Sequence, residues 1–195
     1  LEFLRKAEKK HEETKALSAE FVQIRTDEIF GDEVKSFGKF WYQEPEKFRA
    51  TYESENSSDI WMLEGKMYSY VPNINQVDVV KLAEGDEAPI HQMLLGFGTK
   101  VEKIQEIFEV DLADEKRGGL FGIDFKSKDL SRSLEYKKIT IYFEKEKVEP
   151  RVIVAEADDS TITVKLEEIR FNPEIKEDTF EKKWPKEAVV VEHGS

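Results

Sequence analysis

Short segments in which apolar and polar residues alternate follow one another along most of the chain. Aromatic and β-branched residues fill these segments, and turn residues such as Gly31-Asp32 and Glu64-Gly65 separate them. A period of two is typical of a β-strand with one buried face. Strands that follow each other closely, with no helix between them, pair as antiparallel neighbours. This pattern therefore predicts one large antiparallel sheet.

The same pattern locates the predicted elements along the chain. Strands are expected over residues 19–24, 37–43, 48–52, 60–63, 67–71, 76–82, 108–112, 121–125, 139–143, 152–154 and 162–171, with a further apolar run over residues 189–191. Helices are expected over residues 1–17, 88–95 and 100–105. The apolar parity reverses between Leu166 and Ile169, which predicts a β-bulge near Glu167 and Glu168.

The balance of strands and helices indicates the fold class. A sheet of about ten to eleven antiparallel strands tends to curl or close, and three short helices can cover only one of its faces. We therefore expect an α+β fold in which a curled antiparallel sheet forms an incomplete, half-open β-barrel. The N-terminal helix and the short central helices would cover its concave side. A chain of 195 residues suits a single domain over residues 1–195.

Charge and cysteine content exclude several classes of partner and site. The chain has 42 acidic and 30 basic residues and a net charge of −12. Such a surface repels nucleic acid and, on average, anionic lipid. No cysteine is present, which excludes disulfides, thiolate catalysis and cysteine-based zinc sites. No apolar run approaches the ~20 residues that a membrane-spanning helix needs.

The candidate catalytic motifs are weak. His11-Glu12-Glu13-Thr14-Lys15 resembles part of a zinc-protease helix, but the second histidine is missing. A hairpin turn explains Asp158-Asp159-Ser160 better than a pair of catalytic carboxylates does. No glycine-rich phosphate loop or nucleophile elbow occurs. We therefore expect a protein that is not an enzyme and that holds no metal and no cofactor.

An ordered set of landmarks carries a resemblance to a known family. The set comprises Leu17-x-Ala19-x-Phe21-x-Gln23, Gly38, Pro45, the run from Phe48 to Tyr52, Asp59-Ile60, Gly65, Tyr70-x-Pro72, Gln76, Pro89, Leu94-Leu95, Asn172, Phe180 and Pro185-x-x-Ala188-x-Val190. In this order they resemble the lipoprotein carrier (LolA-like) family over nearly the whole chain. Two positions depart from the family pattern. Glu44 stands where the family has an arginine tied to lid closure, and residues 122–125 lack the proline of a family Leu-x-Pro.

The resemblance implies a function, a location and partners. Family members hold lipoprotein acyl chains in a hydrophobic cavity and transfer them from the inner membrane towards the outer membrane. The implied location is the periplasm, and the chain, which opens without a signal peptide, would be a mature or trimmed form. The implied partners are an acylated lipoprotein or lipid, an inner-membrane ABC transporter and an outer-membrane receptor. We expect a monomer.

Aromatic residues, methionines and one leucine are the candidates for the cavity and its lid. They are Phe21, Phe37, Trp41, Phe48, Tyr52, Met62, Met67, Tyr70, Met93, Leu94, Phe121, Phe125 and Phe143. Strand alternation defines two faces without telling which one is inner, so any single member could instead belong to a filled core. Two other functions share the expected fold. One is a lipid-binding sensor or regulatory module, and the other is an outer-membrane lipoprotein receptor anchored through an N-terminal lipidated cysteine.

Overall fold

The structure is a computed structural model that describes residues 2–45, 47–53, 58–82, 100–115, 117–128 and 136–193. The helices of this part of the chain are α1 (Glu2–Glu12), α3 (Val101–Ile107) and the 3-10 helices η1 (Pro72–Ile74) and η2 (Glu177–Phe180). Its strands are β1 (Ala16–Asp27), β2 (Glu33–Gln43), β3 (Lys47–Tyr52), β4 (Asp59–Leu63), β5 (Lys66–Val71), β6 (Gln76–Lys81), β7 (Phe108–Leu112), β8 (Phe121–Ser127), β9 (Lys138–Glu144), β10 (Glu149–Glu156), β11 (Ser160–Phe171) and β12 (Val189–His193).

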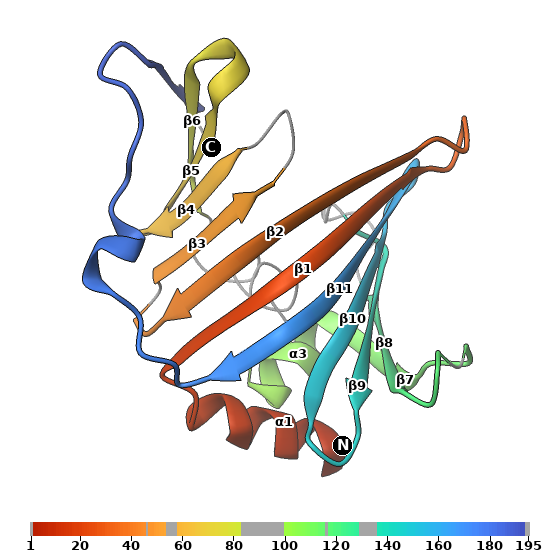
Figure 1. Cartoon of the computed structure of the whole chain (residues 1–195). Helices are drawn as coiled ribbons and strands as arrows, with labels where there is room; N and C mark the ends of the chain where they lie inside the picture. Colours follow the sequence, from red (N-terminus) through yellow and green to blue (C-terminus); the bar gives the residue numbers. More distant parts are fainter. Residues whose placement is uncertain are drawn as a thin grey trace. The chain divides into compact units, whose positions relative to one another are not determined.

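The strands of the described ranges belong to one sheet of twelve strands (Figure 1), in the order β12-β6-β5-β4-β3-β2-β1-β11-β10-β9-β8-β7. The order starts at β12 and ends at β7, so the sheet does not close on itself. This arrangement confirms the predicted α+β class with an incomplete antiparallel barrel. One strand differs from the prediction. β12 is an additional edge strand, and it runs parallel to β6.

The chain divides into two compact units, and three strands run through both. The first unit comprises Leu1–Glu13, Val22–Lys35 and Gly85–Leu166, and the second comprises Thr14–Phe21, Ser36–Glu84 and Glu167–Ser195. Each of β1, β2 and β11 contributes residues to both units. The single domain over residues 1–195 stays a prediction.

The N-terminal helix is shorter than its apolar spacing predicts. It ends at Glu12, and β1 already begins at Ala16. The side-chain oxygen of Asn172 accepts hydrogen bonds from the backbone N–H groups of Lys15 (2.6 Å) and Ala16 (3.2 Å). These bonds satisfy amides at the start of the strand, a contact that only a residue far along the chain can provide. The expected helix over residues 88–95 lies outside the described residues.

The first unit packs two helices and an apolar sheet face. On this face Phe121, Ile123 and Phe125 of β8 lie opposite residues of β9 with the same character. The α1 side chain Phe3 contacts Phe121, with ring centroids 4.7 Å apart, and also Phe143, at 5.0 Å. Helix α3 buries two apolar side chains. The apolar residues that alternate along these strands therefore form a packed core in the first unit.

The other face of the first unit contains a buried polar pair. Thr140 of β9 donates a hydrogen bond of 2.6 Å to the carboxylate of Asp124 on β8, and both residues are buried. We expect Thr140→Val to lower the free energy of unfolding by about 1.5–3 kcal/mol, because it leaves a buried carboxylate without this donor. Chemical denaturation measures this loss. The control is Thr163→Val, at a half-buried threonine on the same face of β11, and an equal loss in both would contradict the prediction.

The second unit has two sheet faces of different character, which the strand register defines. We call one of them the methionine face. Its apolar members are Phe40, Tyr42, Phe48, Ala50, Tyr52, Ile60, Met62, Met67, Val71 and Val80, and its polar members include Ser69, Gln76 and Asp78. We call the other the tryptophan face, and its members include Trp41, Arg49, Asp59, Trp61, Tyr68, Tyr70, Val77 and Val79.

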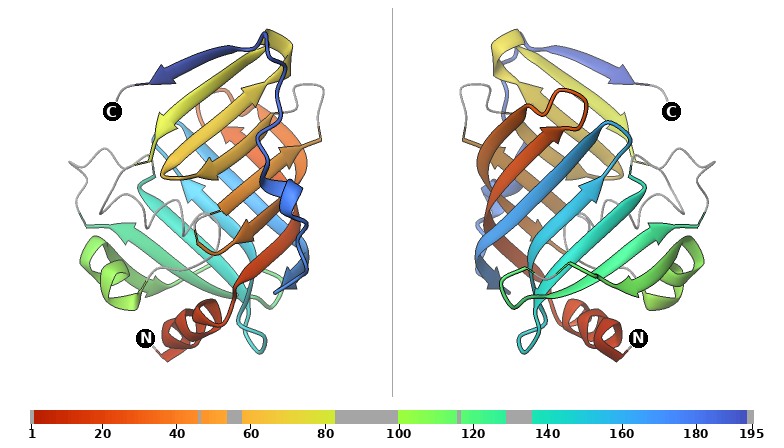
Figure 2. Two further views of the ribbon diagram at one scale, coloured as in Figure 1. Left: turned by 90° about the vertical axis from the view of Figure 1, so that its left-hand side faces the viewer. Right: turned by 90° about the vertical axis from the view of Figure 1, so that its right-hand side faces the viewer.

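The C-terminal segment covers the tryptophan face. The ring of Trp184 packs edge-on against Trp61, at 5.7 Å between centroids, and stacks on Tyr68 at 6.0 Å. Arg49 donates a hydrogen bond of 2.9 Å to the carbonyl oxygen of Thr179. In Figures 1 and 2 the segment, coloured blue, passes across the strands of this unit before it continues into β12. This face is therefore a core between the sheet and the segment.

The predicted irregularity in β11 coincides with a backbone feature. Glu168 has φ +47°, in the left-handed region that most residues avoid. A residue in this conformation lets a strand shift its facing. The parity reversal between Leu166 and Ile169 thus falls where the backbone departs from regular strand geometry.

Candidate functional site

The methionine face contains both buried and half-buried apolar side chains. Phe40 and Phe48 are buried and lie with ring centroids 5.8 Å apart. Met62 lies directly opposite Met67 across β4 and β5, and both are half-buried, as is Tyr52. Methionine side chains are flexible and polarizable, so they can pack against ligands of irregular shape. The arrangement suits an apolar ligand that needs no fixed orientation.

Tyr52 lies in an apolar environment on the methionine face. Its ring contacts Phe21 edge-on, at 5.2 Å between centroids. Burial raises the pKa of Tyr52 above its ordinary value, because the charged phenolate would lose its hydration. The phenol is therefore neutral at physiological pH and adds no charge to the face.

The register separates the predicted cavity residues into groups. Phe21, Phe48, Tyr52, Met62 and Met67 are brought together at the methionine face. Phe37, Trp41 and Tyr70 have the opposite parity and point to the other side of the same strands. Phe121, Phe125 and Phe143 belong to the apolar face of the first unit. Met93 and Leu94 lie outside the described residues.

The thirteen residues therefore cannot all line one face. The physical reason is that neighbouring residues of a strand point to opposite sides of the sheet. In β2 the sequence offers both Phe40 and Trp41, and only the pairing with β3 shows that Phe40 shares its face with Phe48. Phe40, Ile60 and Val80 were missed. Strict alternation from Met62 is the signal that could have found Ile60, whereas Phe40 and Val80 need the strand pairing.

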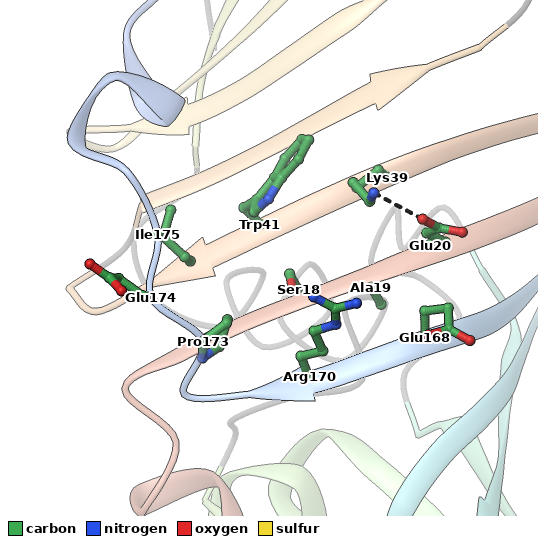
Figure 3. A pocket seen from close by; sticks show the side chains of 10 residues that line it. All are labelled: Ser18, Ala19, Glu20, Lys39, Trp41, Glu168, Arg170, Pro173, Glu174 and Ile175. Carbon is green, nitrogen blue, oxygen red and sulfur yellow. Dashed lines mark ion pairs between the residues drawn. The ribbon is translucent and has the colours of Figure 1, made fainter.

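Trp41 lies in a separate pocket of about 200 Å³ in the second unit (Figure 3). The lining residues are Ser18, Ala19, Glu20, Lys39, Trp41, Glu168, Arg170, Pro173, Glu174 and Ile175. Lys39 forms an ion pair of 2.9 Å with Glu20 and holds the pKa of that carboxyl below its ordinary value, mainly through its hydrogen bond. With five charged side chains around one indole, this pocket does not suit an acyl chain.

Glu44 and Arg49 both have charged partners. Glu44, where the resemblance leads us to expect an arginine, pairs with the ammonium of Lys15 at 2.8 Å. Arg49 pairs with Asp59 at 3.1 Å on the tryptophan face, and its guanidinium lies over Trp61 at 5.4 Å. Arg49 thus helps to hold the C-terminal segment on the tryptophan face.

Within the described ranges, no three His, Asp or Glu side chains gather closely enough to hold a metal ion. In the same ranges, no helix has both the length and the apolar character needed to cross a bilayer.

A family model matches the greater part of the chain. Residues 12–183 match the family model described as "Outer membrane lipoprotein carrier protein LolA". The chain belongs to the LolA family. The match covers both units and every strand except β12. No curated protein matches the chain.

Solved structures share the LolA-like fold at low sequence identity. An uncharacterized conserved protein from Thermus thermophilus is 14% identical, with a TM-score of 0.61 and coverage of 98% of both chains. A DUF1329 family protein from Desulfovibrio piger is 10% identical, with a TM-score of 0.51 and coverage of 92% of this chain and 94% of that one. MucB in the Pseudomonas aeruginosa MucA/MucB complex is 11% identical, with a TM-score of 0.54, and the match covers 93% of this chain and 60% of that one. At these identities the similarity shows the fold alone.

Proposed function

We propose that this LolA-family chain is a periplasmic carrier that binds lipoprotein acyl chains, or a free lipid, on the methionine face. The observation that carries the proposal is the contrast between the two faces of one sheet. The C-terminal segment packs on the tryptophan face, where Trp61, Val77 and Val79 are buried, whereas Tyr52, Met62 and Met67 on the methionine face are half-buried. Apolar side chains that stay partly accessible and gather on one face favour binding of an apolar ligand. The family description supplies the lipoprotein.

The energetics suit a carrier. Each buried methylene contributes ~0.8 kcal/mol, so a chain of sixteen carbons is kept from water by something on the order of 12 kcal/mol. Release into water would therefore be very slow. Transfer is feasible only when the acceptor offers an equally apolar site, which makes the exchange nearly balanced. A flexible lining of methionine and aromatic side chains permits such an exchange better than a rigid pocket does.

The remaining parts of the proposal follow from the family. The chain would receive acylated lipoprotein from an inner-membrane ABC transporter and pass it to an outer-membrane receptor, as a monomer and without catalysis or a cofactor. In the first unit Phe121 and Phe143 contact Phe3 of α1, so an acyl chain on the apolar face of Phe121, Phe125 and Phe143 would have to displace that helix.

The test is a pair of charge insertions on the methionine face. Met62→Glu combined with Met67→Glu places two carboxylates opposite each other on half-exposed positions. We expect the affinity for a fluorescent palmitoylated lipopeptide to fall by at least about tenfold, because two carboxylates would lose hydration beside the acyl chain. Fluorescence titration measures the affinity, and native mass spectrometry measures bound lipid.

The matched control is Leu63→Glu. Leu63 adjoins Met62 in β4 but points to the opposite face, where it lies across from Lys66. A glutamate there gains a cationic neighbour, and we expect unchanged lipopeptide binding. Circular dichroism establishes that all variants are folded. Equal lipopeptide binding by the folded Met62→Glu/Met67→Glu variant and the control would remove the methionine face from the site.

A further inference from the structure

The hairpin that joins β1 to β2 exposes two large apolar side chains at its tip. Ile29 is 71% exposed and Phe30 is 79% exposed, and Val34 follows them in β2 at 62%. Figure 1 shows this turn where β1 ends and β2 begins. Single exposed apolar residues are common on protein surfaces, but three within six positions of one hairpin are a cluster that needs an explanation.

The tip is rigidly organised. The carboxylate of Asp27 accepts hydrogen bonds of 2.8 Å from the backbone N–H groups of both Ile29 and Phe30. The N–H of Gly31 donates to the carbonyl of Asp27 at 2.8 Å, and Gly31 has φ +74°, which a glycine adopts without strain. These bonds hold the backbone of the tip in one turn.

A second anchor ties the tip to the neighbouring turn. The N–H of Glu28 donates a hydrogen bond of 2.9 Å to the carbonyl of Asp159, in the turn between β10 and β11. All of these residues lie in the first unit. The tip is thus pre-organised, and a partner that binds it loses little conformational entropy in doing so.

Carboxylates surround the apolar pair. Asp27, Glu28, Asp32 and Glu33 lie within the hairpin, and Asp159 lies beside it. Acidic side chains around an apolar centre match a surface of the opposite kind, an apolar pocket with a basic rim. They oppose insertion into a bilayer, because carboxylates resist dehydration and anionic headgroups repel them.

We propose that Ile29 and Phe30 form an anchor that inserts into an apolar pocket rimmed by lysine and arginine on a protein partner. This interaction surface is separate from the methionine face and does not depend on the proposed lipid binding. Asp27 acts as a positioning residue, since it holds the turn and contributes charge without being the apolar contact. Phe30, the most exposed of the pair, is the central contact.

The experiment begins with a photoreactive benzoyl-phenylalanine at position 30, in the full chain produced in its own cells. A second version carries the same group in place of Leu112, another apolar side chain of the first unit that is 67% exposed. Cross-linked proteins are identified by mass spectrometry, and the cross-linked residue is mapped. The purified partner is then titrated with the wild type, the double variant Ile29→Ser/Phe30→Ser and the control Leu112→Ser.

The expected result has three parts. Position 30 and not position 112 cross-links one protein, at an apolar site flanked by lysine or arginine. The double variant binds that protein at least about tenfold more weakly while the control binds normally. The wild-type affinity falls between 50 and 500 mM NaCl.

Three results would overturn the proposal. They are the absence of a cross-link specific to position 30, an unchanged affinity of the double variant, and binding to phosphatidylcholine or phosphatidylglycerol vesicles that the double substitution abolishes. The last result would assign the tip to a membrane surface. Lipopeptide binding by the Ile29→Ser/Phe30→Ser variant is measured in parallel. This measurement distinguishes failure of the proposed protein contact at the tip from failure of the proposed lipid site.

Discussion

Replacing Trp61 by alanine is expected to lower the free energy of unfolding by about 3–5 kcal/mol, the range for a fully buried tryptophan. Trp61 is 0% exposed and lies at the centre of the tryptophan face. Its ring contacts the ring of Trp184, and the guanidinium of Arg49 lies over it, 5.4 Å from the Trp61 ring centroid. The truncation would therefore leave a cavity and also loosen the contact that holds the C-terminal segment on the sheet.

Two further variants separate the causes of this loss. Trp61→Phe keeps an aromatic ring and removes an indole N–H that has no acceptor among the described residues, so its cost should be much smaller. Trp184→Ala removes the partner ring from a half-buried position. Denaturant titration of the single and double variants gives the coupling energy between the two rings. Additive losses would show that the C-terminal segment is held by other contacts.

Replacing Gly38 by alanine is expected to cost about 3 kcal/mol, at the upper end of the range for overpacking. A Cβ atom at this position would overlap the carbonyl oxygen of Thr51 and the ring of Phe21. The oxygen belongs to the paired strand β3, so it cannot move without disturbing the β2–β3 ladder. The ring of Phe21 would also be displaced from Tyr52, and the methionine face would change shape.

The comparison variant is Gly122→Ala in the first unit. A Cβ there would meet the methyl group of Ala113 at 2.7 Å and the ring of Tyr142 at 2.9 Å, and both are side-chain atoms. Side chains can shift more easily than a paired backbone, so we expect a smaller loss of unfolding free energy. Thermal and denaturant unfolding measure both variants. An equal loss would show that β2 and β3 can separate locally to accept the methyl group.

This geometry explains why a glycine stands at position 38, one of the landmarks of the family resemblance. The Phe21 ring lies directly on the β2 backbone there. Removing the side chain at position 38 lets Phe21 and Tyr52 meet above it. This landmark thus helps to shape the proposed lipid-binding surface.

The amino-acid sequence alone determined the class of fold and most of its strands. The alternation of residues predicted β2 to β6 to within a few residues, because a strand with one buried face requires a period of two. The parity reversal in β11 predicted the irregularity at Glu168, since a strand that keeps its apolar side chains on one face must absorb an extra residue. The ordered landmarks also identified the family.

The tertiary structure decided which side of each strand is buried and which segment packs against it. Phe40 and Trp41 are adjacent and both aromatic, and alternation alone cannot say which of them joins Phe48. That choice depends on the C-terminal segment, whose Trp184 packs on Trp61 from more than a hundred positions away in the chain. The early end of α1 likewise depends on Asn172. Local sequence specifies the period of a strand, but the identity of its buried face follows from contacts between distant segments.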